Sequence, residues 1–246
     1  MNARDAHAAN EGPAPIILVP GFWLAAWAWD EVGSILRRDG HEVAALTLPG
    51  LESRDVDRSA ITFAHHVDAV VRAVEAAGRP VVLVVHSAAG FTGYAASDRV
   101  SERISAMVYV DTTPGKPPLE PDFDGVEKPL EWDSVAAEEN LDGLSEEQLA
   151  RFRERAVPEP GALLRDRYTF TNDARRRIPS TIIATGFSSE AYRSDAREHP
   201  EWSFLAGIPE LEDLSWVDLP TSHWPMWSKP AELAAIIADV ARRAGT

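Results

Sequence analysis

The sequence predicts an α/β fold in which a mostly parallel central sheet carries helices on both faces. Short, wholly apolar runs such as residues 16–19 and 81–85 are typical of strands that are buried on both sides. These runs alternate with longer segments whose apolar residues recur at helical spacing. Such alternation favours parallel strands joined by crossover helices. Because ligands of such sheets bind beyond the carboxyl ends of the strands, we expect a functional site at that edge.

The first half of the chain supports this prediction element by element. Residues 16–19 form a strand that ends at Pro20-Gly21, and residues 22–39 lead through a loop into a helix that ends at Gly40. After a strand over residues 42–48, Thr62 caps a helix that ends near Gly78. The elements expected next are a strand over 81–85, a helix over 88–100 and a strand over 104–110 that ends on Asp111.

Residues 114–179 interrupt the alternation, and we expect them to form a helical lid over the strand ends. Five prolines between positions 114 and 129 break regular structure. Ser145 and Gln148 then form the capping box of a helix that runs to about residue 155, and a second short helix is expected near 162–167. The arginine run 175–177 is interpreted as a solvated face. The lid is an insertion, so residues 1–246 are predicted to form a single domain.

The alternation resumes after the lid and continues to the end of the chain. The expected elements are a strand over 181–185, a helix within 189–206, a strand over 214–219 and a closing helix over 230–243. The loop over residues 220–226 follows the last strand and therefore lies at its carboxyl end. This loop contains His223.

Charge and composition limit the partners of this chain. The formal net charge is −15, with 39 acidic against 24 basic residues, so the surface repels nucleic acids and anionic membranes. An uncharged small molecule is the expected substrate. The chain has no cysteine, which excludes disulfides and thiolate chemistry. The N-terminal residues are polar and no stretch approaches a membrane span, so we expect a cytoplasmic protein; no oligomeric state is indicated.

Ser87 is the candidate nucleophile because it lies at the sharp turn between a buried strand and a helix. The usual motif for such a turn is G-x-S-x-G, in which small residues relieve crowding, whereas this chain has Val85 and Ala89 at the two glycine positions. A serine also needs a base that removes its proton. Among seven histidines, His223 alone follows a strand with no periodic pattern to explain it, whereas His86 adjoins Ser87 and points away from it.

Four motifs resemble the α/β-hydrolase family over nearly the whole chain, from residue 16 to 243. They are Val-Pro-Gly-Phe-Trp at 19–23, Leu-Pro-Gly at 48–50, His-Ser-Ala-Ala-Gly at 86–90 and His-Trp-Pro-Met at 223–226. The last motif is similar to that of small esterases related to plant methylesterases and hydroxynitrile lyases. The lyases place a lysine directly after the histidine, where this chain has Trp224, and lyase chemistry is therefore disfavoured.

The resemblance implies a serine esterase that needs neither a metal nor an organic cofactor. The backbone N–H groups of Phe22 and Ala88 would form the oxyanion hole. For the acid that orients His223, Asp111 is favoured and Glu190 is the alternative, because the family's usual aspartate after the penultimate strand is missing here.

The substrate pocket is expected to have walls of Trp23, Trp132 and Trp224. The same three catalytic groups could also hydrolyse a lactone, an amide or a carbon–carbon bond. A second alternative is a catalytically weak, ligand-binding relative. It is motivated by Val85, Ala89 and the displaced acid, because a widened turn could misplace Ser87 relative to its oxyanion donors.

Overall fold

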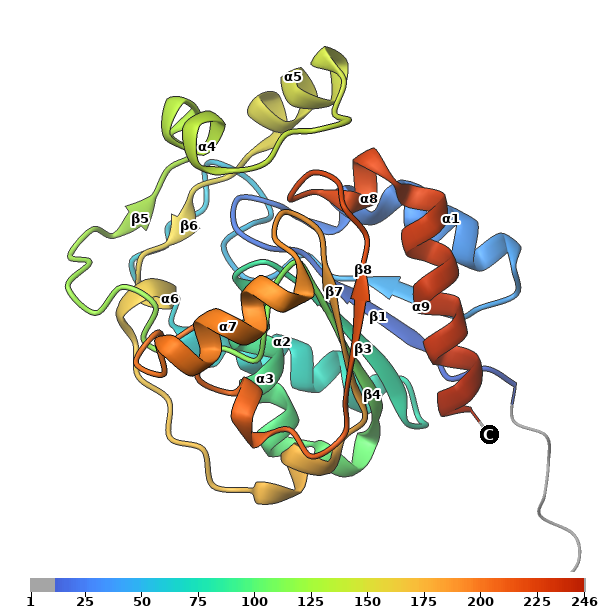
Figure 1. Cartoon of the computed structure of the whole chain (residues 1–246). Coiled ribbons are helices and arrows are strands. Elements are labelled where there is room, and N and C mark those ends of the chain that lie inside the picture. Colours follow the sequence, from blue (N-terminus) through green and yellow to red (C-terminus); the bar gives the residue numbers. More distant parts are fainter. Residues whose placement is uncertain (1–11, 246) are drawn as a thin grey trace, which may run out of the picture.

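The central sheet has six strands, and every neighbouring pair is parallel, as predicted. The computed structural model describes residues 12–245, so the N-terminal tail lies almost wholly outside the described residues. The strand order is β2-β1-β3-β4-β7-β8, and the carboxyl ends of the strands meet at the top of Figure 1. The bounds are β1 Ile16–Val19, β2 Val43–Ala45, β3 Val81–His86, β4 Ile104–Val110, β7 Ser180–Ala184 and β8 Leu214–Asp218.

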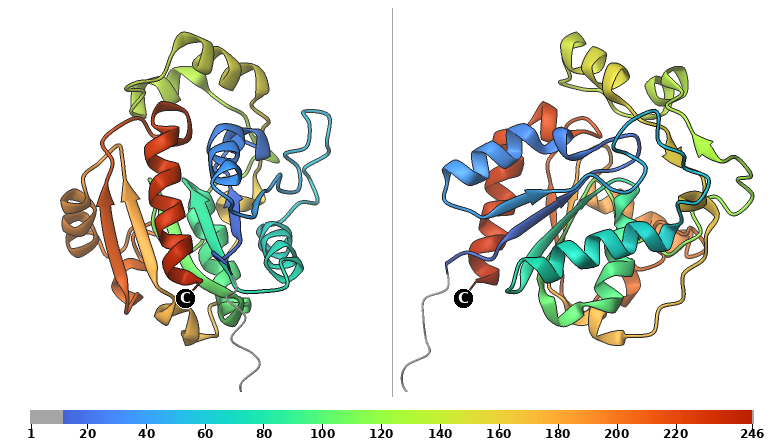
Figure 2. Two further views of the ribbon diagram at one scale, coloured as in Figure 1. Left: turned by 90° about the vertical axis from the view of Figure 1, so that its right-hand side faces the viewer. Right: turned by 180° about the vertical axis from the view of Figure 1, so that it is seen from behind.

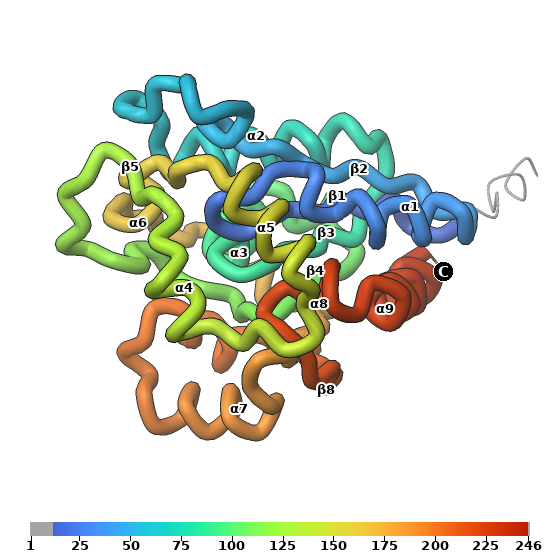
Figure 3. The backbone as a smooth tube through the Cα atoms, turned by 90° about the horizontal axis from the view of Figure 1, so that it is seen from above, coloured from blue at the N-terminus to red at the C-terminus, as the bar shows by residue number. Residues whose placement is uncertain are grey.

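Helices cover both faces of this sheet (Figures 2 and 3). Helices α1 and α9 pack on one face, while α2, α3 and α7 pack on the other. The bounds are α1 Asp30–Arg38, α2 Phe63–Ala76, α3 Ala89–Arg99, α7 Ser189–Glu198, α8 Pro225–Ser228 and α9 Pro230–Ala244. The predicted cap of α2 is confirmed, because the Thr62 hydroxyl accepts a hydrogen bond from the His65 N–H. Between residues 12 and 245, no helix is long and apolar enough to cross a bilayer.

The alternation of side chains along β3 divides the core into two halves. Val82 and Val84 point toward α1 and α9, whereas Val81, Leu83 and Val85 point toward α2 and α3. All five side chains are fully buried. Burial on both faces is the reason that this strand is uniformly apolar rather than alternating.

The lid lies above the carboxyl ends of the strands (Figures 1 and 2). Its elements are β5 Glu127–Lys128, α4 Trp132–Glu138, α5 Glu146–Arg155, β6 Glu159–Pro160 and α6 Ala162–Arg165. The predicted capping box is present, since the Ser145 hydroxyl accepts from the Gln148 N–H and the Gln148 side chain accepts from the Ser145 N–H. Helix α4 and the antiparallel pair of β5 with β6 were not predicted, because each is short and lacks a clear periodic pattern.

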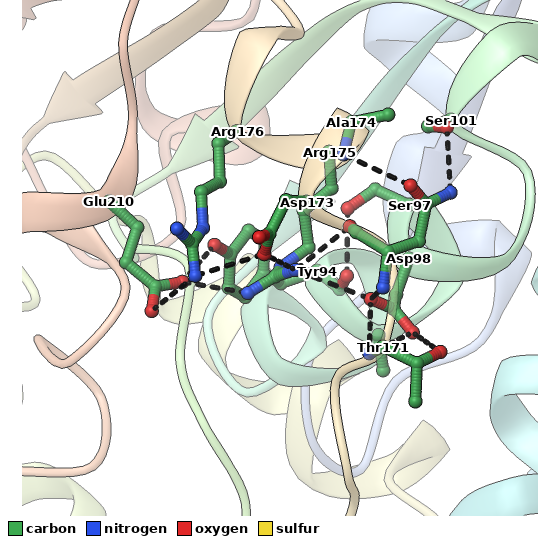
Figure 4. Close-up of polar contacts among 12 residues, drawn as sticks. Tyr94, Ser97, Asp98, Ser101, Thr171, Asp173, Ala174, Arg175, Arg176 and Glu210 are labelled. Atoms are coloured by element: carbon green, nitrogen blue, oxygen red, sulfur yellow. Dashed lines mark hydrogen bonds and ion pairs between the residues drawn. The ribbon is translucent and has the colours of Figure 1, made fainter.

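The last part of the predicted lid, residues 166–179, leaves the strand ends and runs down beside α3. It is held there by the Asp98 carboxylate, which accepts hydrogen bonds from the backbone N–H groups of Thr171 and Asn172 (Figure 4). Arg175 lies 3.4 Å from Asp98 and 3.0 Å from Glu210, and its side chain is 3% exposed. The interpretation of Arg175 as part of a solvated face was therefore wrong. From here on, "cap" means residues 114–165.

Candidate active site

Ser87 occupies a strained turn directly after β3. Its φ of 52° lies in the left-handed region, which non-glycine residues rarely adopt. The Ser87 N–H donates to the Val110 carbonyl at 3.2 Å, and the Ser87 carbonyl accepts from the Gly90 N–H at 2.9 Å. The turn thus has the elbow shape that the sequence predicts, and it places the serine above the sheet edge.

The structure brings Ser87, His223 and Asp111 into one line of hydrogen bonds. His223 Nε2 lies 2.9 Å from Ser87 Oγ, and His223 Nδ1 lies 2.6 Å from Asp111 Oδ2. A carboxylate can only accept, so Nδ1–H donates to Asp111 and Nε2 is left to accept the serine proton. These are the contacts needed to activate a serine hydroxyl.

Asp111 is held by the loop that follows the neighbouring strand β7. It has a φ of 44°, and its Oδ1 accepts from the Thr185 N–H at 2.9 Å and the Gly186 N–H at 3.1 Å. Burial raises the pKa of Asp111, but its hydrogen bond to His223, the His223 charge and these two amides together lower it below the ordinary value. The carboxyl is therefore ionised at neutral pH. Sequence reasoning did not anticipate these supporting amides, because they depend on the adjacency of β4 and β7.

Glu190, the alternative acid, lies away from the histidine. It is exposed in the first turn of α7, and within residues 12–245 it makes no contact with His223. A different carboxylate is close: Glu139 Oε2, at the end of cap helix α4, lies 3.7 Å from His223 Nδ1. No motif marks Glu139, and only the packing of the cap reveals it.

His223 is further fixed by the cap and by His86. Its backbone N–H donates to the Asn140 carbonyl at 2.8 Å, and its own carbonyl accepts from His86 Nε2–H at 2.7 Å. Burial and the neighbouring His223 lower the pKa of His86 to about 3, so His86 is neutral. For His223, burial lowers the pKa, but the hydrogen bond and charge of Asp111 and the charge of Glu139 raise it above the usual value.

The two predicted oxyanion donors flank Ser87. Phe22 and Ala88 both line the cavity above the serine, and in the described part of the chain neither backbone N–H donates a hydrogen bond. Gly21 packs directly against the elbow, because a Cβ at this position would lie 2.6 Å from Ser87 Cβ. A glycine is therefore required for the loop to approach the serine.

A cavity of about 950 Å³ opens above Ser87, between the cap and the strand ends. Its apolar lining is mainly aromatic and includes Phe22, Trp23, Phe91, Leu119, Phe123, Val135, Phe187 and Phe204. Six carboxylates also line it, against a single lysine: Asp111, Glu120, Glu127, Glu131, Glu138, Glu139 and Lys128. Lys128 is paired with Glu120. Within residues 12–245, no group of three or more acidic, histidine or cysteine side chains could hold a metal ion.

Only one of the three predicted pocket tryptophans lines this cavity. Trp23 does so, but Trp224 is 2% exposed and packs against Phe152 in the core beneath the cap. Trp132 packs edge-on against Phe152 as well, and Arg153 covers its ring. The prediction for Trp132 and Trp224 was wrong, because neither a place in the lid, as for Trp132, nor a place beside His223 in the sequence, as for Trp224, determines where a side chain points.

The chain matches the family described as the alpha/beta hydrolase family over residues 16–236. It is 25% identical to Methylesterase 7 of Arabidopsis thaliana over 264 residues, which cover 92% of this chain and 95% of that protein. It is 31% identical to the carbendazim hydrolyzing esterase of a Nocardioides species over 100 residues, which cover 40% of this chain and 41% of that esterase. An extracellular alpha/beta-hydrolase from a Paenibacillus species has the same fold, with a TM-score of 0.75, 20% identity, and coverage of 94% of this chain and all of that one.

Proposed function

The chain belongs to the alpha/beta hydrolase family, and from this premise we propose that it is a serine esterase acting on small uncharged carboxylic esters. Ser87 is the nucleophile, His223 the general base and acid, and Asp111 the group that orients His223. The observation that carries the proposal is the pair of hydrogen bonds, 2.9 Å and 2.6 Å, that connects the three side chains through the two ring nitrogens of His223.

In the acylation step, Ser87 Oγ attacks the ester carbonyl while its proton moves to His223 Nε2. The backbone N–H groups of Phe22 and Ala88 stabilise the negative oxygen of the tetrahedral intermediate. His223 then gives its proton to the leaving alcohol, and an acyl-enzyme forms on Ser87. In the second step, His223 activates a water molecule that releases the acid. Asp111 stabilises the imidazolium that forms in both steps.

The lining of the cavity supports an uncharged, mainly apolar substrate. Aromatic side chains offer contact surface to an apolar acyl group. The carboxylates of Glu131, Glu138 and Glu139, all contributed by the cap, disfavour an anionic substrate. The methylesterase among the relatives supports a small alcohol portion, such as methanol.

The structure gives no reason to favour a catalytically weak relative. That alternative rested on Val85, Ala89 and the displaced acid, but Ser87 Oγ and Asp111 Oδ2 are both within hydrogen-bond distance of the His223 ring nitrogens. The esterase proposal is accordingly the stronger one.

A fluorophosphonate probe tests the proposed nucleophile. We expect the wild-type protein to be labelled at Ser87, identified by peptide mass spectrometry, and the Ser87→Ala variant to stay unlabelled. In parallel, wild-type protein should hydrolyse p-nitrophenyl butyrate, whereas Ser87→Ala and His223→Ala should lose most of this activity. Folded wild-type protein that neither reacts with the probe nor cleaves the ester would contradict the proposed function.

A further inference from the structure

We propose that Glu159 is a positioning residue that holds the oxyanion loop, residues 21–23, through a hydrogen bond to the Trp23 N–H. Glu159 lies in cap strand β6, 136 residues away in sequence, and its Oε2 accepts from the Trp23 backbone N–H at 3.0 Å. Its effect on the reaction rests on the proposed function, since Phe22 is the oxyanion donor next to Trp23. The hydrogen bond itself does not depend on that function.

Burial makes a carboxylate an unusual choice at this position. Glu159 is 2% exposed, and burial raises its pKa to about 8, although the bond from Trp23 and the charge of Arg58 act in the opposite direction. Arg58 forms its ion pair with Glu127 at 3.1 Å and not with Glu159. An apolar side chain would fill the same space without desolvation of an ionisable group. The interaction that the carboxyl specifically provides is the one with Trp23.

Trp23 is the residue whose backbone needs such support. Its φ of 64° lies in the left-handed region, which is unfavourable for a bulky side chain. Three hydrogen bonds fix it, and all come from the cap: its N–H donates to Glu159, its carbonyl accepts from the Val157 N–H at 3.1 Å, and its indole N–H donates to the Lys128 carbonyl at 3.1 Å. The cap, rather than the sheet, therefore determines the conformation at position 23.

A change at Trp23 is transmitted to the oxyanion site because the loop has no room to adjust. Rotation of φ at Trp23 toward its relaxed range turns the peptide that joins Trp23 to Phe22 and shifts the Phe22 N–H. On the other side of Phe22, Gly21 already lies against the Ser87 turn, because a Cβ at position 21 would lie 2.6 Å from Ser87 Cβ. A displaced oxyanion donor weakens binding of the transition state more than binding of the substrate. Loss of the Glu159 contact should consequently lower kcat and leave KM nearly unchanged.

Two variants separate the hydrogen bond from the ability of the carboxyl to ionise. Glu159→Gln keeps an acceptor oxygen at the same reach and cannot ionise, whereas Glu159→Asp keeps the carboxyl group but is one methylene too short. Glu147→Ala, an exposed carboxylate on cap helix α5, is the matched control. The readouts are amide hydrogen exchange at Trp23 by NMR and the kcat and KM for p-nitrophenyl butyrate.

We expect Glu159→Asp to speed exchange at Trp23 at least about tenfold and to lower kcat by about 10- to 100-fold with KM within about threefold. Glu159→Gln and Glu147→Ala should stay close to wild type in both measurements. Unchanged Trp23 exchange in Glu159→Asp overturns the proposal, and so does equal impairment of Glu159→Gln. If Glu159→Asp does not fold, Glu159→Gln decides alone: wild-type exchange and kcat support the proposal, and impairment overturns it. Wild-type protein without esterase activity would count against the proposed function only, because Trp23 exchange still decides the role of the hydrogen bond.

Discussion

Gly93 on helix α3 packs so closely against Val85 that a Cβ at position 93 would lie 2.4 Å from Val85 Cγ1. Val85 occupies the first of the two positions that are usually glycine in an elbow of this kind. The bulk added at Val85 is thus compensated by the absence of a side chain at Gly93, eight residues later on helix α3. This pairing explains how the elbow keeps its shape with a valine in it.

Gly93→Ala should destabilise the protein by about 1–3 kcal/mol, because the added methyl group clashes with Val85. The matched control is Gly33→Ala in helix α1, where a Cβ would meet only the end of the flexible Arg37 side chain at 3.1 Å. That control should gain up to about 1 kcal/mol from helix propensity. Urea denaturation measures both. Combining Gly93→Ala with Val85→Ala should restore stability, and a double variant no more stable than Gly93→Ala would argue against the pairing.

Asp111→Asn should lower kcat for p-nitrophenyl butyrate by at least about a hundredfold, because an amide neither stabilises the imidazolium nor selects the required tautomer of His223. Glu190→Gln should remain within about twofold of wild type, since Glu190 is exposed on α7. Steady-state kinetics on the two variants measure this contrast. The assignment of the acid is wrong if the two variants are equally active.

The pH dependence of kcat/KM should report the pKa of His223 in the free enzyme. The base must be unprotonated, and its pKa is raised above the usual value of about 6.5 by Asp111 and Glu139. Activity should therefore fall as the pH decreases through a pKa higher than 6.5. Glu139→Gln removes one of the charges that stabilise the imidazolium, so the acidic limb should move to lower pH. Glu138→Gln is the control on the same helix, and an acidic limb that stays in place in Glu139→Gln would exclude the role given to Glu139.

Neutral esters should be hydrolysed faster than anionic ones of the same size. We expect kcat/KM for p-nitrophenyl butyrate to exceed that for p-nitrophenyl hemisuccinate by at least about tenfold, after correction for their rates with hydroxide. Replacing Glu131 and Glu138 together by glutamine should reduce the difference, and about 1 M salt should do the same. Equal rates for the two esters at low salt would show that the cap carboxylates do not influence the choice of substrate.

Most elements of the fold could be predicted because their signals are local. Buried strands such as β3 are uniformly apolar, and helix N-terminal capping residues such as Thr62 and Ser145 are recognised within four residues of sequence. Ser87 and His223 could also be placed, since chain order fixes which loops reach the carboxyl edge of the sheet. Asp111 was favoured over Glu190 because the end of the strand after the elbow is an alternative acid position in some members of the family that the sequence resembles.

The contacts made by the cap could not be predicted, because they depend on how irregular segments pack. Glu139 and Glu159 look like ordinary acidic residues in the sequence, yet one approaches His223 and the other holds Trp23. The error at Trp132 and Trp224 has the same origin. Trp224 adjoins His223 along the chain and Trp132 lies in the lid, but the rings of both pack around Phe152.

The bonds between the cap and the catalytic loops also bear on how a substrate reaches Ser87. The cap is hydrogen-bonded to the Trp23 backbone through Glu159 and to the His223 backbone through the Asn140 carbonyl. Lifting the cap would break the hydrogen bonds that hold these two residues in place. Phe187 and Phe204 border the same cavity, and they are 66% and 36% exposed. We expect this aromatic rim to be the entrance. Substrate would enter and product would leave past Phe187 and Phe204 while the cap keeps its contacts with Trp23 and His223.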